Sequence, residues 1–434
     1  MNSILLTQNS TFIIGQVAWV LGKIMEGIFN VIDAIGIPNI GLAIILFTIV
    51  VNLLMMPLTI KQQKFSKLSA KISPETQAIQ AKYKGRKDQE SQMAMNNEIQ
   101  AVYAKYGVSP TGSCVYLLIQ MPILLALYRV IYAMPAYVTK IGDTFRVLAD
   151  KIISVDNAEF LQNSGSDTIN AVINTYGKSI TNGNIQNGIV DVLNKLSTAD
   201  MNLISSHYDL SNLTFNGQLI LSNGTTRGLI DIYNNFLGIN IGNSPSYMVQ
   251  EALSQKAYLM VIVALIIPVL SALTQWINVK LMPQQDTNNS NMNDQAAAMA
   301  SSMKTMNTVM PLMSAFFCYT LPSGMGLYWV AGSVVRSIQQ VIINKHIDKM
   351  DFDEIIKKNA TKSAKKMEKL KANQEKLSAY ANMNTKNIQS NANMSTKAKV
   401  SNVDTDISTN TKAKAGSMMA KANMVKDFNE KNNK

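Results

Sequence analysis

Five stretches of the 434-residue sequence are each long and apolar enough to cross a lipid bilayer as a helix. A bilayer core about 30 Å thick needs about 20 helical residues. Helices satisfy their own backbone polar groups in hydrocarbon, so the sequence predicts an all-α polytopic membrane protein. The predicted spans lie at about 40–60, 114–134, 257–279, 305–321 and 325–344. When their flanking residues are included, the first, second and fifth spans extend over 37–60, 112–134 and 322–345.

The charges between these spans predict their orientation, because lysine and arginine favour cytoplasmic connections. Residues 61–111 carry nine basic against four acidic residues, whereas residues 135–256 carry seven against ten. From Lys345 onward there are nineteen lysines and ten acids. We therefore expect 61–111, 280–304 and the basic tail 346–434 to be cytoplasmic. The loop 135–256 and the N-terminus are then extracytoplasmic.

The N-terminal segment 1–36 carries an amphipathic pattern over residues 12–36. Lys23, Glu26 and Asp33 recur at helical spacing, and apolar residues fill the positions between them. Such a helix can lie in the headgroup layer, and no basic region of a signal peptide precedes it. A sixth span is the alternative interpretation, although its three charges would then need partners in lipid.

Residues 61–111 read as a helical hairpin in the cytoplasm. Two helix-like stretches, 61–83 and 89–106, are separated by "KGRKD", and Gly107 and Pro110 end the second. We expect the basic surface of this hairpin to face anionic headgroups; a solvated connector is the alternative. The basic residues assigned to that surface are Lys61, Lys64, Lys67, Lys71, Arg86 and Lys87.

Catalytic, metal and cofactor chemistry finds little support in the sequence. The two cysteines, Cys114 and Cys318, lie apart within apolar runs, and the two histidines, His207 and His346, lie far apart in polar surroundings. No GxxxxGK[ST] loop is present for nucleotide binding. We expect no metal site, no cofactor and no enzyme activity.

Four strings of sequence carry a specific resemblance. The strings "NIGLAIILFTIVVNLLMMPLTIKQQK", "YAKYGVSPTGSCVYLLIQMPILLALYRVIY", "MPLMSAFFCYTLPSGMGLYW" and "SIQQ" occur in that order. They resemble the YidC/Oxa/Alb family of membrane protein insertases, in the five-span form of Gram-positive bacteria. The resemblance implies that five spans enclose a hydrophilic groove open to the cytoplasm, through which nascent membrane proteins are inserted without nucleotide hydrolysis. It also implies a chaperone role and the Sec translocon as a possible partner.

One residue departs from the pattern that the resemblance implies. Most relatives have an arginine where this chain has Asn52, and that charge is thought to attract acidic substrate segments. Arg336 lies seven residues after Trp329, which borders the groove in the family, and a seven-residue step returns to the same helix face. Both Asn52 and Arg336 lie about 18 Å from the outer ends of their spans. We therefore hypothesise that the groove charge has moved to Arg336; the alternatives are a snorkelling arginine and an interhelical hydrogen bond from Asn52.

The predicted groove lining is completed by Gln120 and Gln275, at positions where relatives carry polar residues. The lysine-rich tail from residue 357 suits ribosomal RNA or anionic lipid equally. We assign no role to the loop 135–256, which is far longer than in five-span relatives. A polytopic solute transporter is the alternative function, with Asn52, Gln275 and Arg336 as its site, although no inverted repeat is evident and no small-molecule substrate is expected. A passive scaffold for the Sec translocon is the third possibility.

Overall fold

Helices form almost all of the described structure, and four two-residue strands are its only described extended elements. The computed structural model describes residues 12–86, 88–107, 112–177, 180, 184–281, 294–349, 354 and 357. These residues belong to one unit, residues 1–367. The predicted tail 346–434 therefore lies almost wholly outside the described residues, as do residues 1–11.

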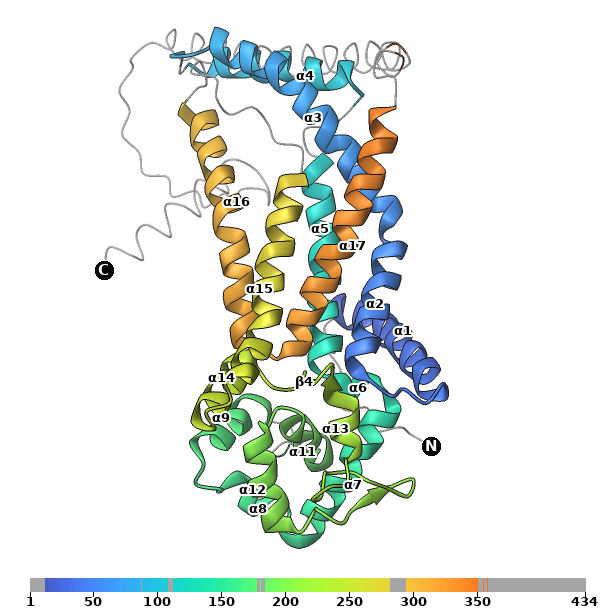
Figure 1. Cartoon of the computed structure of the whole chain (residues 1–434). Coiled ribbons are helices and arrows are strands. Elements are labelled where there is room, and N and C mark those ends of the chain that lie inside the picture. The colour runs from blue at the N-terminus through green and yellow to red at the C-terminus, as the bar shows by residue number, and fades with distance from the viewer. Residues whose placement is uncertain are drawn as a thin grey trace, which may run out of the picture. The chain divides into compact units, whose positions relative to one another are not determined.

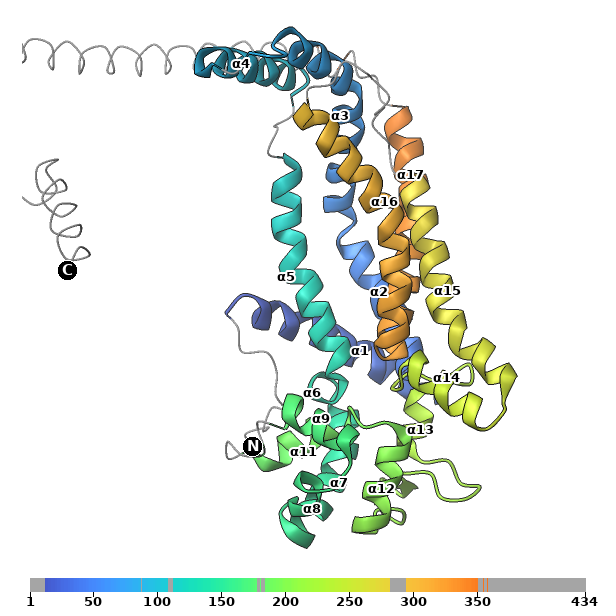
Figure 2. The same cartoon turned by 90° about the vertical axis from the view of Figure 1, so that its left-hand side faces the viewer.

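The long helices form a bundle in which α2 and α3 follow each other end to end and the others run alongside (Figures 1 and 2). Within it α15 packs against both α16 and α17, and α17 also packs against α2. We call this group the bundle, and it consists of α2 (Ile40–Leu54), α3 (Met56–Lys82), α5 (Gly112–Tyr132), α15 (Tyr258–Leu281), α16 (Asp294–Thr320) and α17 (Ser323–Asp348).

Helix α15 has the length and apolar composition to cross a membrane by itself. Only 22% of its most apolar window is buried within the protein, whereas a core helix of a water-soluble protein would be mostly buried. Among the described residues, the bent pair α2 and Met56–Ser69 passes the same test together, and Leu118–Tyr132 is a shorter apolar helix. The five-span arrangement therefore stays a prediction.

The first predicted span, 40–60, contains a break. Helix α2 ends at Leu54, α3 starts at Met56, and the two axes differ by 60°. Pro57 stands in the first turn of α3, where a proline is tolerated because its missing N–H has no intrahelical partner. Helix α3 then continues without interruption to Lys82, so the inner part of the predicted span and the first hairpin helix are one element.

The α3–α4 hairpin has a small core of its own. Helix α4 runs from Gln89 to Lys105, and Leu68, Ile72 and Tyr106 are buried together between the two helices. The Tyr106 hydroxyl donates a 2.5 Å hydrogen bond to Glu75, which with Lys105 lowers the pKa of that carboxyl. The hairpin is therefore a packed unit rather than a solvated connector.

Helix α1 (Ile14–Ala34) runs across the lower ends of α2 and α5 (Figure 2). It buries an apolar face that includes Ala18, Met25 and Phe29. Its acidic residues have partners in the described structure: Glu26 pairs with Lys23, and the Asp33 carboxylate lies 2.6 Å from the ammonium of Lys140. These charges are thus satisfied within the chain.

The predicted loop 135–256 is a folded domain, which we call the loop domain. Its helices pack around a continuous apolar core that includes Ile141, Leu148, Ile189 and Ile204. Its elements are α6 (Met134–Tyr137), α7 (Thr139–Asp156), α8 (Glu159–Gln162), α9 (Asp167–Tyr176), α11 (Ile185–Leu193), α12 (Thr198–Tyr208), β1 (Thr214–Phe215), β2 (Gln218–Leu219), α13 (Leu229–Asn234), β3 (Asn235–Phe236), β4 (Ile239–Asn240) and α14 (Pro245–Ser254).

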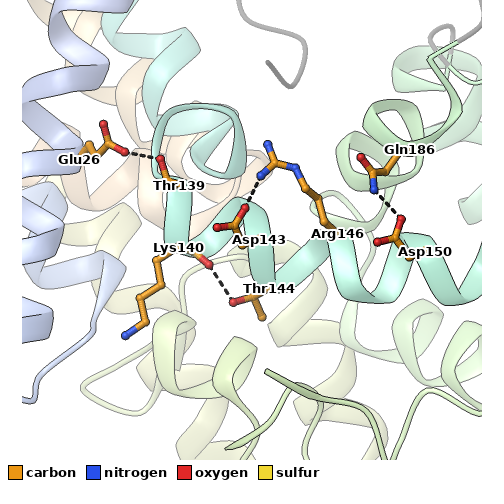
Figure 3. Close-up of polar contacts among 8 residues, drawn as sticks. All are labelled: Glu26, Thr139, Lys140, Asp143, Thr144, Arg146, Asp150 and Gln186. Carbon is orange, nitrogen blue, oxygen red and sulfur yellow. Dashed lines mark hydrogen bonds and ion pairs between the residues drawn. The ribbon is translucent and has the colours of Figure 1, made fainter. Parts of the chain in front are cut away.

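Helix α7 of the loop domain bonds to α1, outside that domain, and to α11, within it. Figure 3 shows Thr139 at the start of α7 donating a hydrogen bond to Glu26 of α1. Further along α7, Asp150 accepts a hydrogen bond from Gln186 of α11. A single helix therefore bonds to both the N-terminal helix and α11.

Candidate functional site

Polar side chains meet where α15 packs against α17, inside an otherwise apolar bundle. The Ser333 hydroxyl accepts a 3.2 Å hydrogen bond from Nη2 of Arg336 and donates a 3.4 Å bond to Oε1 of Gln275. Asn278 donates to the Ser333 carbonyl at 3.1 Å and accepts from the Ser337 hydroxyl at 2.9 Å. We call these five residues the polar seam.

The guanidinium of Arg336 folds back toward the start of α17, which is the end next to the loop domain. Its Nη1 would lie 3.1 Å from a Cβ placed on Gly332, one turn earlier in the helix. Helical side chains lean toward the N-terminus, so this direction is the natural one. A snorkelling arginine would instead extend toward the far end of α17, and Arg336 does not.

Gly332 provides the space in which that guanidinium lies. A Cβ at this position would also be 3.6 Å from Cγ2 of Thr48, which is fully buried on α2. The absence of a side chain at Gly332 therefore brings α2, α17 and the head of Arg336 together. Gly332 itself is buried, whereas Arg336 is exposed.

Arg336 has no acidic partner in the described part of the chain. No salt bridge joins it to a described carboxylate, and α2, α5 and α15 contain no aspartate or glutamate at all. An unpaired charge in a low-dielectric setting is costly, and the hydroxyl of Ser333 offsets only part of that cost. The site can therefore stabilise an anionic group supplied from outside the chain.

Asn52 lies close to this region but uses its side chain locally. Its amide donates a 2.7 Å hydrogen bond to the Thr48 carbonyl within α2. Its own backbone carbonyl accepts a 3.0 Å bond from Gln339 of α17, whose side chain is buried. The interhelical contact at Asn52 is thus made by its backbone and by Gln339, while Oδ1 of Asn52 has no hydrogen bond among the described residues.

The structure joins some of the sequence-predicted residues and separates others. Gln275 and Arg336 meet through Ser333, and Asn52 bonds to Thr48 beside Gly332. Trp329 is half-buried and packs against Phe317 of α16, with ring centroids 6.1 Å apart. Gln120 is exposed on α5, and no described hydrogen bond joins it to the seam.

Sequence reasoning missed Ser333, Ser337, Asn278 and Gly332. A signal for them exists, because Ser333 and Ser337 are four residues apart and therefore share a helix face. Asn278 likewise follows Gln275 by three residues. Small hydroxyl residues in an apolar run are easily dismissed as helix-packing residues, and only the facing Gln275 and Asn278 of α15 show otherwise.

The predicted basic surface of the hairpin is described for four of its six residues. Lys61 and Arg86 are exposed, and Lys64 is half-buried. Lys67 donates a 3.4 Å hydrogen bond to the carbonyl of Asn344, near the end of α17, where a cation also complements the helix dipole. The side chain of Lys71 and the whole of Lys87 lie outside the described residues.

A comparison with protein families accounts for most of the bundle. The family model described as "60Kd inner membrane protein" matches residues 31–199 and 229–350, well over half of the chain. The chain belongs to the 60Kd inner membrane protein family. The match includes every residue of the polar seam, together with Asn52, Gln120 and the whole hairpin.

Individual relatives in this family match shorter segments. A protein of Oceanobacillus iheyensis named "Membrane protein insertase YidC" is 38% identical over 126 residues, which is 29% of this chain and 46% of that protein. "Membrane protein insertase MisCA" of Bacillus subtilis is 45% identical over 93 residues, 21% of this chain and 35% of the relative. "Membrane protein insertase YidC 1" of Streptococcus pyogenes is 46% identical over 91 residues, covering 21% and 33%. The chain thus spans less than half the length of each of these relatives.

Proposed function

We propose that this protein inserts other proteins into the bacterial cell membrane and helps them fold, without hydrolysing nucleotide. Its family membership and the names of its relatives support this proposal. The observation that carries it is the unpaired Arg336 held in the polar seam among apolar helices. The substrates would be nascent membrane proteins, recognised by their short polar segments and apolar helices.

The polar seam would lower the cost of moving a polar segment across hydrocarbon. Each unsatisfied backbone group costs several kcal/mol in lipid, so a hydrated site part-way through the membrane reduces the barrier. Arg336 would attract an acidic residue of the translocated segment, while Gln275 and Asn278 offer hydrogen bonds to its backbone. The apolar part of the substrate then moves into lipid, and its burial there drives the step.

In this proposal Arg336 replaces the arginine that relatives carry at the position of Asn52. Two distances support the replacement: the Arg336 head lies against Gly332, and Gly332 lies against Thr48, the residue whose carbonyl Asn52 contacts. The cation would therefore occupy nearly the same depth as an arginine on α2. Asn52 would supply a free amide oxygen as a further polar group in the groove.

We further propose five spans around a groove open to the cytoplasm, with α2 and the start of α3 as the first span. The loop domain would lie outside the cell and the α3–α4 hairpin inside. Exposed Lys61 and Arg86 would then meet anionic lipid headgroups. The tail beyond residue 357 would contact the ribosome. The Sec translocon would be a partner of the protein.

A solute transporter remains the competing function, because a polar cluster among membrane helices could also bind a small solute. The two functions differ in what crosses the membrane. We would reconstitute the purified protein in liposomes without nucleotide and add a membrane protein with one short acidic translocated segment. Protection of that segment from external protease, above the level in empty liposomes, is the expected result. No protection, together with uptake of a labelled small solute, would establish the transporter instead.

A further inference from the structure

Two hairpins of the loop domain share one geometry. Each pairs two residues with two, in the registers Thr214↔Leu219 and Phe215↔Gln218 for β1–β2, and Asn235↔Asn240 and Phe236↔Ile239 for β3–β4. Each is closed by a two-residue turn with positive φ at both positions, 51° and 78° in the first turn and 52° and 84° in the second. This is the type I′ arrangement, which fits the twist of the strands.

The two turns differ in the residue at their first position. β1–β2 has Asn216 followed by Gly217, the pair that this turn favours, whereas β3–β4 has Leu237 followed by Gly238. A leucine with positive φ is destabilised, because its Cβ crowds the following carbonyl. Leu237 is also 84% exposed, so no packing within the described chain offsets that cost.

The β3–β4 hairpin is fixed at the ends of the bundle helices (Figure 1). Asn39 caps α2 with its side-chain oxygen and donates a 2.7 Å hydrogen bond to the carbonyl of Asn235. At the other side, the backbone N–H groups of Ser323 and Gly324, at the start of α17, donate to the carbonyls of Asn243 and Ile241. The β3–β4 hairpin therefore lies at the level where α2 and α17 begin.

Close packing sets the position of the hairpin along α2. The side chain of Phe236 lies where a Cβ on Gly41 would be, at 2.5 Å, so any side chain at residue 41 would displace it. Ile35 and Ile37, which precede α2, are exposed apolar residues close in sequence to Asn39. Leu237 is likewise an exposed apolar residue, in the hairpin that packs on this end of α2, and no charged residue occurs between Asp231 and Glu251.

We propose that the β3–β4 turn inserts Leu237 into the lipid leaflet on the loop-domain side and holds that domain against the membrane. Transfer of a leucine side chain from water to an apolar environment is favourable, and this gain offsets the cost of its backbone conformation. Asn216 marks the corresponding turn that stays in water. The occupant of the exposed surface is therefore lipid, not a partner protein.

The test uses the full chain with Cys114 and Cys318 replaced, carrying one new cysteine at either Leu237 or Asn216. Each cysteine is labelled with an environment-sensitive fluorophore, and the protein is reconstituted in phosphatidylcholine and phosphatidylglycerol vesicles with nitroxide groups at a shallow acyl position. Lipids in both leaflets carry the nitroxide, so the orientation of the protein does not affect the result. We expect quenching at residue 237 to exceed quenching at residue 216 by at least threefold.

Equal quenching at the two turns would overturn the proposal and leave a protein partner as the explanation for Leu237. Both labelled proteins must keep the unfolding midpoint of the parent chain. Should the cysteine at residue 237 unfold the loop domain, Leu237→Trp and Asn216→Trp, read by brominated lipid after subtraction of the parent signal, give the same comparison. Insertion activity does not enter either measurement, so the outcome is independent of the proposed function.

Discussion

The bundle exposes many large apolar side chains, whereas the loop domain buries most of its own. In α15 the exposed residues include Leu259, Ile262 and Val269, while Ser271 and Thr274 are buried. In the loop domain the buried residues are almost all apolar, and Ile141 and Leu148 of α7 face its core. One chain therefore contains a part suited to lipid and a part suited to water.

This difference shows which contacts each part can rely on. In the proposed topology the loop domain lies in water, where apolar burial stabilises it. Lipid offers the bundle no such gain, so close packing at small residues and hydrogen bonds between helices must hold it together. Substitutions of comparable size should therefore have different consequences in the two parts. In the loop domain they should mainly change stability, and in the bundle they should mainly change function.

The largest effect is expected for Asp156→Ala in the loop domain. The Asp156 carboxylate accepts 2.9 Å hydrogen bonds from the N–H groups of Ala158 and Phe160, and it accepts from the buried Tyr208 hydroxyl at 3.0 Å. Its loss leaves a buried hydroxyl without its acceptor and releases a turn with two residues at positive φ, Asn157 and Ala158. We expect a cost of about 2–4 kcal/mol.

Limited proteolysis in detergent would check this expectation, with new cleavage confined to residues 135–256. Ser206→Ala is the matched control, because the Ser206 hydroxyl bonds only to its own helix at the surface. Unchanged proteolysis of the Asp156→Ala protein would mean that the loop domain does not depend on its own polar network.

A functional effect is expected for Gly332→Ala in the bundle. The new methyl group would stand 3.1 Å from Nη1 of Arg336 and would push the guanidinium away from Ser333. Insertion of a substrate with an acidic translocated segment should fall up to tenfold, equivalent to about 1.4 kcal/mol. The liposome protection assay measures this change.

Gly27→Ala serves as the control for that substitution. Gly27 is also a helical glycine, in α1, but a Cβ there would meet no atom within 4 Å. The exchange should leave insertion unchanged and stabilise the helix by about 0.5–1 kcal/mol. Equal insertion by the two variants would contradict a role for the position of the Arg336 head.

A smaller, pH-dependent effect is expected for Lys195→Met where the loop domain meets α5. The ammonium of Lys195 lies 3.2 Å from the ring centroid of Tyr132. Burial lowers the pKa of Lys195 from 10.5 to about 7, and Asp191 opposes that shift. The unfolded chain then binds more protons between these pH values, so stability rises with pH from about 7 to 10.5.

Thermal unfolding at several pH values from 7 to 10 would measure that slope, which is on the order of 1 kcal/mol per pH unit at most. The Lys195→Met protein should lose this part of the pH dependence, because methionine cannot bind a proton. A slope that is identical in both proteins would show that Lys195 stays charged in the folded chain.

The sequence predicts much of the bundle and little of the loop domain. Apolar runs depend only on local composition, so α15 and α17 begin and end within a few residues of the predicted ranges. Pro57 lies beside the break at Met55, but a proline in the sequence does not tell a kink from a full break. The loop domain depends on contacts such as Asn39 with Asn235, which are 196 residues apart.

The polar seam shows the same limit at smaller scale. The face of α17 that carries Arg336 follows from helical periodicity, but its contact with Gln275 depends on how α15 and α17 pack. Gly332 is one of several glycines in apolar runs, and only the packing shows that its missing side chain makes room for the arginine head.

The most direct test of the proposed insertase mechanism is complementation of a bacterium depleted of its own insertase. The set would contain the unchanged protein, Arg336→Ala, Asn52→Arg and the double variant, with Arg129→Ala as control because Arg129 is exposed near the loop-domain end of α5. We predict that Arg336→Ala fails, that the control supports growth, and that Asn52→Arg restores growth to Arg336→Ala. Equal growth with every variant would contradict a role for the charge of Arg336.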